Sequence, residues 1–165
     1  MMWRSWVLSG FALLAGIGSG GAAAQGRFQP LPDGDEIRDA RSGLVWRRCA
    51  EGMTWKAGRC DGKALTVPHP SAVSRAADEA ARSGKAWRLP TMKELSAIAS
   101  VAEADPTSGV AAIDATAFPG TPALRFWTSS SAGPHYFMYV GFKDADFGEN
   151  TRTLPAAMRL VRSPN

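Results

Sequence analysis

The sequence is poor in cysteine, histidine and tyrosine, and these shortages exclude several classes of protein. Its 165 residues include two cysteines, two histidines and two tyrosines. Two cysteines are too few for a four-cysteine zinc site or for a miniature scaffold held together by many disulfides. The formal net charge is only +4, which is too small to indicate a nucleic-acid partner, so we expect none. With 45% hydrophobic and 21% charged residues, the chain has the composition of one soluble globular domain.

A long apolar run is also missing, except near the N-terminus. Arg4 precedes an apolar stretch over residues 6–17, and the small residues that follow end in three alanines at position 24. This layout predicts a secretory signal peptide over residues 1–24. The apolar stretch is shorter than the about 20 residues that a transmembrane helix needs, although an uncleaved anchor stays open as an alternative. We therefore expect a periplasmic or secreted protein with no stable membrane span after cleavage.

Export changes the interpretation of the two cysteines. In an oxidising compartment Cys49 and Cys60 are the only pair that can form a disulfide. Ten residues lie between them, whereas a redox-active pair typically has two. The sequence therefore predicts a structural disulfide, which would stabilise the fold by roughly 3 kcal/mol in the chain-entropy model.

Prolines and glycines mark the first boundaries of the mature chain. Their presence between residues 25 and 34 predicts a linker, and residues 35–163 are then left as one domain. A β-hairpin is predicted over residues 37–46, with its turn at residues 40–43. The segment between the two cysteines is predicted to be a loop or a short hairpin.

Two helices are predicted in the middle of the chain. The first covers residues 72–82, with Ser71 as its N-cap and alanines along one side. The second starts at Thr91, where Glu94 has the spacing of a capping box, and ends at Pro106.

Extended segments surround these helices. Residues 86–89 must be extended, because Pro90 disfavours helical geometry at the residue before it. Strands are predicted over residues 124–129, 136–142 and 158–161. Strands come first and last, with two helices between them, so we predict an α+β domain built around one antiparallel sheet.

Five short motifs occur in order along this domain. They are Ser42-Gly43-Leu44-Val45-Trp46, Trp87-Arg88-Leu89-Pro90-Thr91 with Glu94-Leu95, Phe118-Pro119, Phe126-Trp127-Thr128-Ser129-Ser130, and Met158-Arg159-Leu160-Val161-Arg162. Together they resemble the Lcl C-terminal domain family, which is named after the C-terminal domain of a bacterial collagen-like adhesin. The resemblance implies an exported bacterial module with a C-type-lectin-like fold. In the named adhesin the domain binds sulfated glycans, so the resemblance also implies a glycan partner.

The second motif is also similar to part of the formylglycine-generating enzymes, which share a lectin-like core. Those enzymes use a cysteine pair late in the chain for copper-dependent oxidation. Both cysteines here precede the shared segment, so that chemistry is not expected, and we identify no catalytic or cofactor-binding residue. Arg88 should need a carboxylate partner, with Glu94 and Asp114 as candidates. We assign structural roles to Trp87, Arg88, Leu89, Pro90, Thr91, Glu94 and Trp127.

Oxygen-bearing side chains gather in a polar loop predicted over residues 143–150. Calcium prefers such ligands, so a calcium site is one hypothesis and a solvated hairpin turn is the other. The candidates are Asp144, Asp146, Glu149 and Asn150. His69, between two prolines, is expected in an extended turn and His135 before a strand, and two isolated histidines do not indicate a zinc site.

The candidate ligand-binding residues surround the predicted disulfide. Trp46, Trp87 and Trp127 lie in predicted strands and are expected in the core, whereas Trp55 is expected to be exposed. An exposed indole beside cations can stack on sugar rings and attract anionic groups, although an ordinary mixed-charge surface is the alternative. The candidates are Arg47, Arg48, Trp55, Lys56, Arg59, Lys63 and, in a separate segment, His135.

These observations favour an exported, non-catalytic binding module that recognises an anionic glycan or another envelope component. An envelope structural or assembly protein that binds another protein is the first alternative. An enzyme of unrecognised chemistry is the second, and it is weakened by the lack of a catalytic set of residues.

Overall fold

The computed structural model describes residues 26–100, 103, 107 and 109–164, and in these residues the chain forms nine short strands and two helices. The predicted signal peptide and Pro106 lie outside the described residues. The elements are β1 (Phe28–Pro30), β2 (Glu36–Asp39), β3 (Val45–Arg47), β4 (Met53–Lys56), β5 (Arg59–Gly62), α1 (His69–Ser83), α2 (Met92–Ile98), β6 (Arg125–Ser131), β7 (Tyr136–Gly141), β8 (Phe147–Thr151) and β9 (Val161–Arg162). This content confirms the α+β class.

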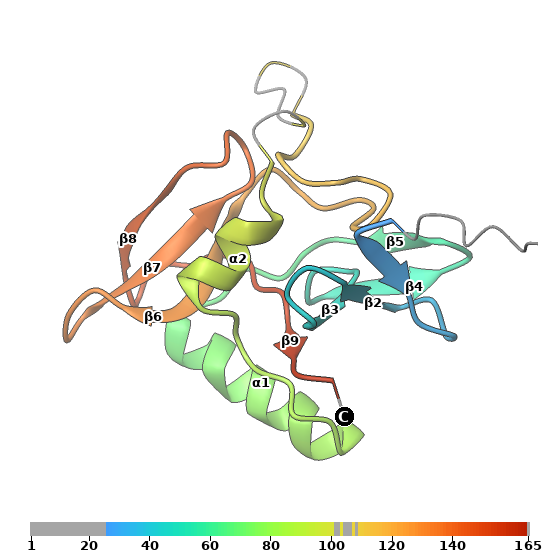
Figure 1. Cartoon of the computed structure of the whole chain (residues 1–165). Coiled ribbons are helices and arrows are strands. Elements are labelled where there is room, and N and C mark those ends of the chain that lie inside the picture. The colour runs from blue at the N-terminus through green and yellow to red at the C-terminus, as the bar shows by residue number, and fades with distance from the viewer. Residues whose placement is uncertain (1–25, 101–102, 104–106, 108, 165) are drawn as a thin grey trace, which may run out of the picture.

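The strands form three separate antiparallel sheets in the described part of the chain, so the prediction of one sheet is wrong. The orders are β1-β2-β3-β9, β4-β5 and β6-β7-β8. In Figure 1 the three-stranded sheet and the disulfide-bearing hairpin β4-β5 lie on opposite sides of the view, and α1 lies below. The short turn between β4 and β5 lets these two strands pair with each other, so they form a separate hairpin without a third strand.

The four-stranded sheet joins the two ends of the domain. The predicted hairpin over residues 37–46 is confirmed, because β2 pairs with β3 across a turn that includes Gly43 with a φ of +76°. The last strand, β9, pairs with β3, so that Val161 lies opposite Trp46. Residues 28–30, inside the predicted linker, form edge strand β1. Proline is tolerated there because one side of an edge strand needs no backbone donor.

Part of the predicted polar loop over residues 143–150 is also a strand. β8 pairs with β7 in a register that places Gly148 opposite Tyr139. A Cβ atom at Gly148 would lie 2.9 Å from the Tyr139 hydroxyl oxygen, so the glycine gives the tyrosine ring room across the ladder.

α1 begins earlier than predicted. Its N-cap is Pro68 with no side-chain cap, so the prediction of Ser71 as N-cap is wrong. Pro70 lies in the first turn, where a missing backbone N–H costs nothing. His69 is therefore the first helical residue, and is buried rather than placed in an extended turn. The helix ends at Ser83, one residue beyond the predicted end, and Gly84 follows in the left-handed conformation.

α2 has the predicted start but is shorter than predicted. The Thr91 side chain accepts a hydrogen bond from the Glu94 backbone, and the Glu94 carboxylate accepts one from the Thr91 backbone. This reciprocal pair confirms the capping box. The helix ends at Ile98, because Ala99 is extended and forms a β-bridge with Ile113.

In the part of the chain that the structure describes, two clusters of buried side chains form the core. One contains Trp46 with Phe118, Phe126 and Phe142, and the other contains Trp87 and Trp127 with residues of α1. The three tryptophans predicted to be buried are at most 3% exposed, which confirms that prediction. Neither helix in the described ranges is long and apolar enough to cross a membrane.

Candidate functional site

A polar pocket of about 410 Å³ lies between the β4-β5 hairpin, the start of β2, β3 and α1. We call it the Trp55 pocket, because the indole of Trp55 forms part of its wall. Its charged lining residues are the acids Asp33, Asp35, Glu51 and Glu79 and the bases Arg47 and Arg82.

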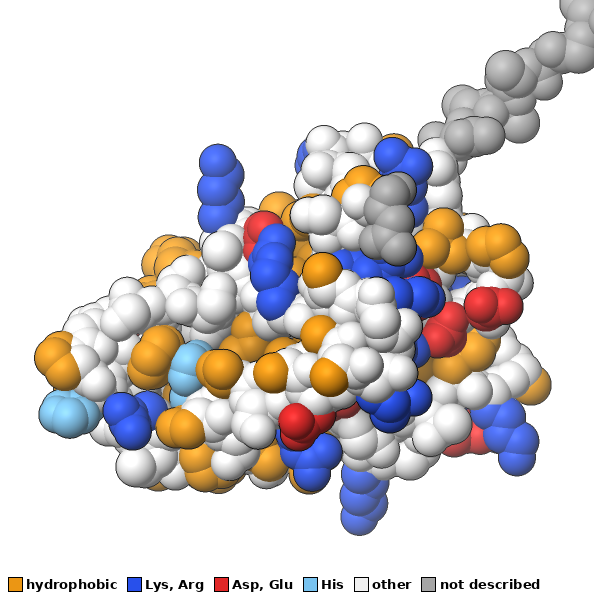
Figure 2. Space-filling model, turned by 90° about the horizontal axis from the view of Figure 1, so that it is seen from below, with side chains coloured by type: hydrophobic (Ala, Val, Ile, Leu, Met, Phe, Trp, Pro, Cys, Tyr) orange, Lys and Arg blue, Asp and Glu red, His pale blue; other side chains and the backbone are white. Residues whose placement is uncertain are grey.

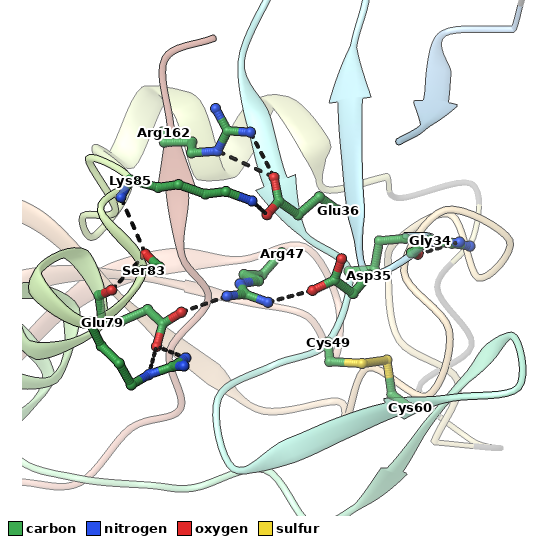
Figure 3. A network of polar contacts seen from close by, with 12 residues as sticks. Gly34, Asp35, Glu36, Arg47, Cys49, Cys60, Glu79, Ser83, Lys85 and Arg162 are labelled. Carbon is green, nitrogen blue, oxygen red and sulfur yellow. Dashed lines mark hydrogen bonds and ion pairs between the residues drawn. A yellow bond between two sulfur atoms is a disulfide. The ribbon is translucent and has the colours of Figure 1, made fainter. Parts of the chain in front are cut away.

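A disulfide holds the hairpin beside the pocket. Cys49 and Cys60 are bonded, with their Cα atoms 5.4 Å apart, as predicted. Cys60 lies directly opposite Trp55 in the β4-β5 register. The bond therefore fixes the strand that faces the tryptophan to the segment that follows β3 (Figure 3).

Trp55 itself is half-buried, and of the four tryptophans in the described residues it is the most exposed. A Cβ atom at Gly34 would lie 3.1 Å from its Nε1 atom, and Gly34 has a φ of +77°. Both the contact and the backbone conformation require glycine at this position. The indole consequently packs against the loop between β1 and β2 and is not a mobile surface ring.

Arg48 lies inside the domain and not on the ligand-accessible surface, which removes it from the predicted binding residues. It is 8% exposed, and its guanidinium lies over the Trp55 ring at 4.2 Å. The same group donates hydrogen bonds to the carbonyl oxygens of Gly34, Thr116 and Ala117. Its role is to support the indole from behind.

Arg47 lines the pocket but is held by two carboxylates. Its guanidinium bonds Asp35 at 2.6 Å and Glu79 at 2.5 Å (Figure 3). Glu79 also accepts from Arg82, one helical turn further along α1. These ion pairs join β3 to α1 and orient the carboxylates, so Arg47 is a poor candidate for capturing an anion.

The remaining acids give the pocket an excess of acceptors. In the described part of the chain, the carboxylates of Asp33 and Glu51 form no hydrogen bond or ion pair with the protein. Burial raises the pKa of Glu51, and the nearby charge of Arg47 offsets this only in part. With four carboxyl groups and two guanidiniums, the pocket suits a ligand that donates hydrogen bonds.

The other predicted cations lie on the outer part of the hairpin. Lys56 and Arg59 are opposite each other across the turn, and Lys63 follows β5. All three are exposed, but Arg59 pairs with Asp61 at 2.6 Å. None of the three lines the Trp55 pocket.

His135 is not brought together with these residues. It is exposed in the loop between β6 and β7, and in Figure 1 these two strands lie on the opposite side of the view from the β4-β5 hairpin. It therefore contributes nothing to the Trp55 pocket.

The four calcium candidates do not converge. Asp144 and Asp146 lie in the turn after β7, while Glu149 and Asn150 are neighbours in β8, one exposed and one buried. Successive side chains of a strand point to opposite faces, which separates the last two. No group of three or more histidine, cysteine or acidic residues in the described ranges is placed to hold a metal ion.

The motif residues have structural contacts. The two terminal nitrogens of Arg88, Nη1 and Nη2, each donate to one oxygen of the Glu94 carboxylate at 2.8 Å. Asp114, the other candidate partner, instead accepts from the backbone of Thr116 and Ala117. The Arg88 side chain is 42% exposed, whereas its neighbours Trp87 and Leu89 are 3% exposed each.

Sequence reasoning missed the pocket acids. The four acids come from three segments that are distant in the chain: Asp33 and Asp35 precede β2, Glu51 follows β3, and Glu79 lies in α1. Glu79 and Arg82 have the spacing of a helical ion pair, but that signal is common on helix surfaces. Only the fold brings them to the hairpin.

Comparison with known proteins agrees with the resemblance drawn from the motifs. A family model described as the Lcl C-terminal domain matches residues 35–162. Searches of curated proteins and of solved structures found no significant match, so the similarity to C-type lectins stays a prediction. The family match covers well over half of the 165 residues. The chain therefore belongs to the Lcl C-terminal domain family.

Proposed function

We propose that the chain is an exported, non-catalytic binding module that recognises a glycan in the Trp55 pocket. The observation that carries this proposal is that the fixed indole of Trp55 and the unpaired carboxylates of Asp33 and Glu51 line the same pocket. Export is supported by the signal-peptide pattern of residues 1–24 and by the Cys49–Cys60 disulfide.

Glycans suit this combination of groups. A sugar ring has an apolar face that can pack on an indole, and its hydroxyl groups both donate and accept hydrogen bonds. Asp33 and Glu51 are available acceptors, and Arg82, 71% exposed in its side chain, is a donor at the rim. Ligand sites commonly combine a shaped cavity with a few oriented polar groups in this way.

The charge of the pocket favours a neutral or amino sugar. Its carboxyl groups outnumber its guanidiniums by four to two, and like charges would repel a sulfate or uronate. A sulfated glycan is the second candidate, and the observation that favours it is the pair of exposed cations Lys56 and Lys63. Neither forms an ion pair within the described residues. Such a ligand would bind the outer face of the hairpin.

The test is a glycan array probed with the full chain, followed by calorimetric titration of the strongest ligand. We expect neutral or amino glycans to bind. Trp55→Ala should weaken binding about tenfold or more, as expected for a central aromatic contact, and Asp33→Asn should weaken it less. The matched controls are Phe147→Ala, which removes a 62% exposed ring from β8, and Asp144→Asn.

Three outcomes contradict the proposal. Retention on heparin that is lost in Lys56→Ala/Lys63→Ala but kept in Trp55→Ala would favour the sulfated-glycan candidate. Absence of any glycan signal together with a defined protein that co-purifies would favour an envelope assembly role. Turnover of a substrate in a hydrolase screen would favour an enzyme.

A further inference from the structure

A second concave surface has a different character from the Trp55 pocket. This groove, of about 660 Å³, lies between α1, the segment of Trp87 and Leu89, and the sheet strand β7. We call it the α1 groove. Its lining is mostly apolar, and among the described residues Arg88 and Arg152 are its charged members and no carboxylate lines it. Figure 2 shows hydrophobic side chains gathered on the face seen from below, where α1 lies.

One wall of the groove is flat and uncharged. The His69 ring stacks on Phe137 with centroids 3.5 Å apart and meets Trp127 edge-on at 5.2 Å. Its Nε2 atom lies 2.9 Å from the Thr128 carbonyl oxygen, which can only accept, so Nε2 carries the proton. Burial lowers the pKa of His69. The imidazole is therefore neutral and presents an apolar surface.

One end of the groove carries an unneutralised positive charge. The backbone of Arg152 is held between α1 and the β6-β7 loop, because its carbonyl accepts from His69 and its N–H donates to His135. Its exposed guanidinium forms no ion pair or hydrogen bond within the described residues. Arg88, by contrast, is neutralised by Glu94.

We propose that the α1 groove binds a fatty acid, with the acyl chain along Val73, Leu89 and Phe137 and the carboxylate at Arg152. The volume is in the range of small-ligand sites. Val73 is 48% exposed, and covering it would remove apolar surface from water. The positive end and the lack of acids complement an anionic amphiphile.

The backbone around the groove argues against an extended peptide as the occupant. The N–H groups of His69, Arg88 and Ser129 already donate to Arg152, Val161 and Pro90. A bound peptide would therefore find few backbone partners, whereas an acyl chain needs none.

The test is a fluorescence titration of the full chain with cis-parinaric acid, kept below its micellar concentration, beside its methyl ester. We expect saturable binding of the acid. Arg152→Gln should weaken the acid about tenfold, the loss expected for one charge-assisted hydrogen bond, and should leave the ester unchanged. Val73→Glu should abolish binding of both. The matched controls on the same helix, Arg75→Gln and Ser74→Glu, should bind like the unmodified chain.

Several results would overturn the proposal. If Arg152→Gln binds the acid as tightly as the unmodified chain does, Arg152 does not hold the carboxylate. Binding that survives Val73→Glu would place the ligand elsewhere, and circular dichroism checks that each variant is folded. Self-association that Val73→Glu abolishes, without binding of the acid, would make a second copy the occupant. Trp55→Ala should leave acid binding intact, which separates this test from that of the glycan proposal.

Discussion

At the scale of single residues, Arg159 is the least expected feature of the domain. Its side chain is 0% exposed and forms no ion pair with a described residue. It donates to the carbonyl oxygens of Arg47 and Arg48 and to Thr121 Oγ1, and it lies over the Phe118 ring at 4.9 Å. Burial lowers the pKa of Arg159 to about 9. Carbonyl dipoles and aromatic rings offset part of the cost of burying this charge. The charge of Glu51 also raises the pKa of Arg159, without forming an ion pair with it.

We predict that Arg159→Lys destabilises the domain by about 2–4 kcal/mol, because a single ammonium group cannot reach both sets of acceptors. Lysine keeps a basic side chain of similar reach but concentrates its donors on one atom, so the loss reports mainly the geometry of the guanidinium. The measurement is the free energy of unfolding in urea. Arg38→Lys, an exposed position in β2, should change it by less than about 0.5 kcal/mol. Equal stability of the two variants would show that the Arg159 hydrogen bonds contribute little.

At the scale of elements, Glu36 connects three parts of the chain. It lies in β2 and is 3% exposed. Its carboxylate bonds Lys85, after α1, at 2.5 Å and Arg162, in β9, at 2.7 Å (Figure 3). Burial raises the pKa of Glu36, but the hydrogen bonds from the two cations outweigh it, and the net pKa is below its ordinary value.

This network predicts that stability falls in acid. The pKa values of Asp39 and Glu94 are also lowered. Burial raises the pKa of Asp39, but hydrogen bonds from Arg27, Arg41 and Ser42 together outweigh it. The hydrogen bond from Arg88 lowers the pKa of Glu94 by more than burial raises it. Below the ordinary values of 3.8 to 4.5, the unfolded chain binds more protons than the folded one. Stability is therefore complete above that range and is lost as pH falls through the folded pKa values.

The measurement is the thermal midpoint between pH 7 and pH 3. Glu36→Gln should lower the midpoint at pH 7 and should lose less than the unmodified chain on acidification. Glu149→Gln, an exposed position in β8, should have the unmodified profile. If Glu36→Gln and the unmodified chain lose the same amount, the ion pairs of Glu36 do not contribute to acid sensitivity.

The elements that sequence predicts correctly are those with local signals. The turn of the first hairpin, the capping box of Thr91 and the end of α1 at Gly84 each depend on a few adjacent residues. Pairing between distant segments has no such signal. The edge strand over residues 28–30 forms by pairing with β2, and the short β9 forms by pairing with β3. The composition around residues 28–30 alone suggested a linker.

The candidate site shows the same limit. Sequence reasoning identified Trp55 and the disulfide, because an indole near two cysteines is visible in one segment. It could not tell that Arg48 turns inward beneath Trp55 while Lys56 stays outside. Nor could it find the acids of the pocket or the partner of Arg47, since Glu79 is on a distant helix. The direction of a side chain is decided by how the folded chain packs, and the order of residues does not show this directly.

At the scale of the whole molecule, the two concave surfaces have opposite charge and share a boundary. The Trp55 pocket is rich in acids and the α1 groove contains none. Arg47 lines the first, and its guanidinium lies 4.9 Å from the ring of Trp87, which lines the second. The ion pair of Arg47 in β3 with Glu79 in α1 thus lies between the acceptor-rich pocket and the apolar groove.

The disulfide belongs to only one of these surfaces, which makes its loss informative. Replacing both cysteines by alanine should reduce the free energy of unfolding by about 3 kcal/mol, because the unfolded chain regains the freedom of a loop of this size. Cys49 and Cys60 are 11 positions apart and hold the hairpin that carries Trp55. Under conditions where the variant stays folded, glycan affinity should fall while binding of cis-parinaric acid stays unchanged.

Urea unfolding of the unmodified chain in reductant should match the double variant. β4 and β5 pair only with each other in the described chain, so we expect the hairpin to support one site. Loss of both ligands in the variant would show instead that the hairpin supports the whole domain.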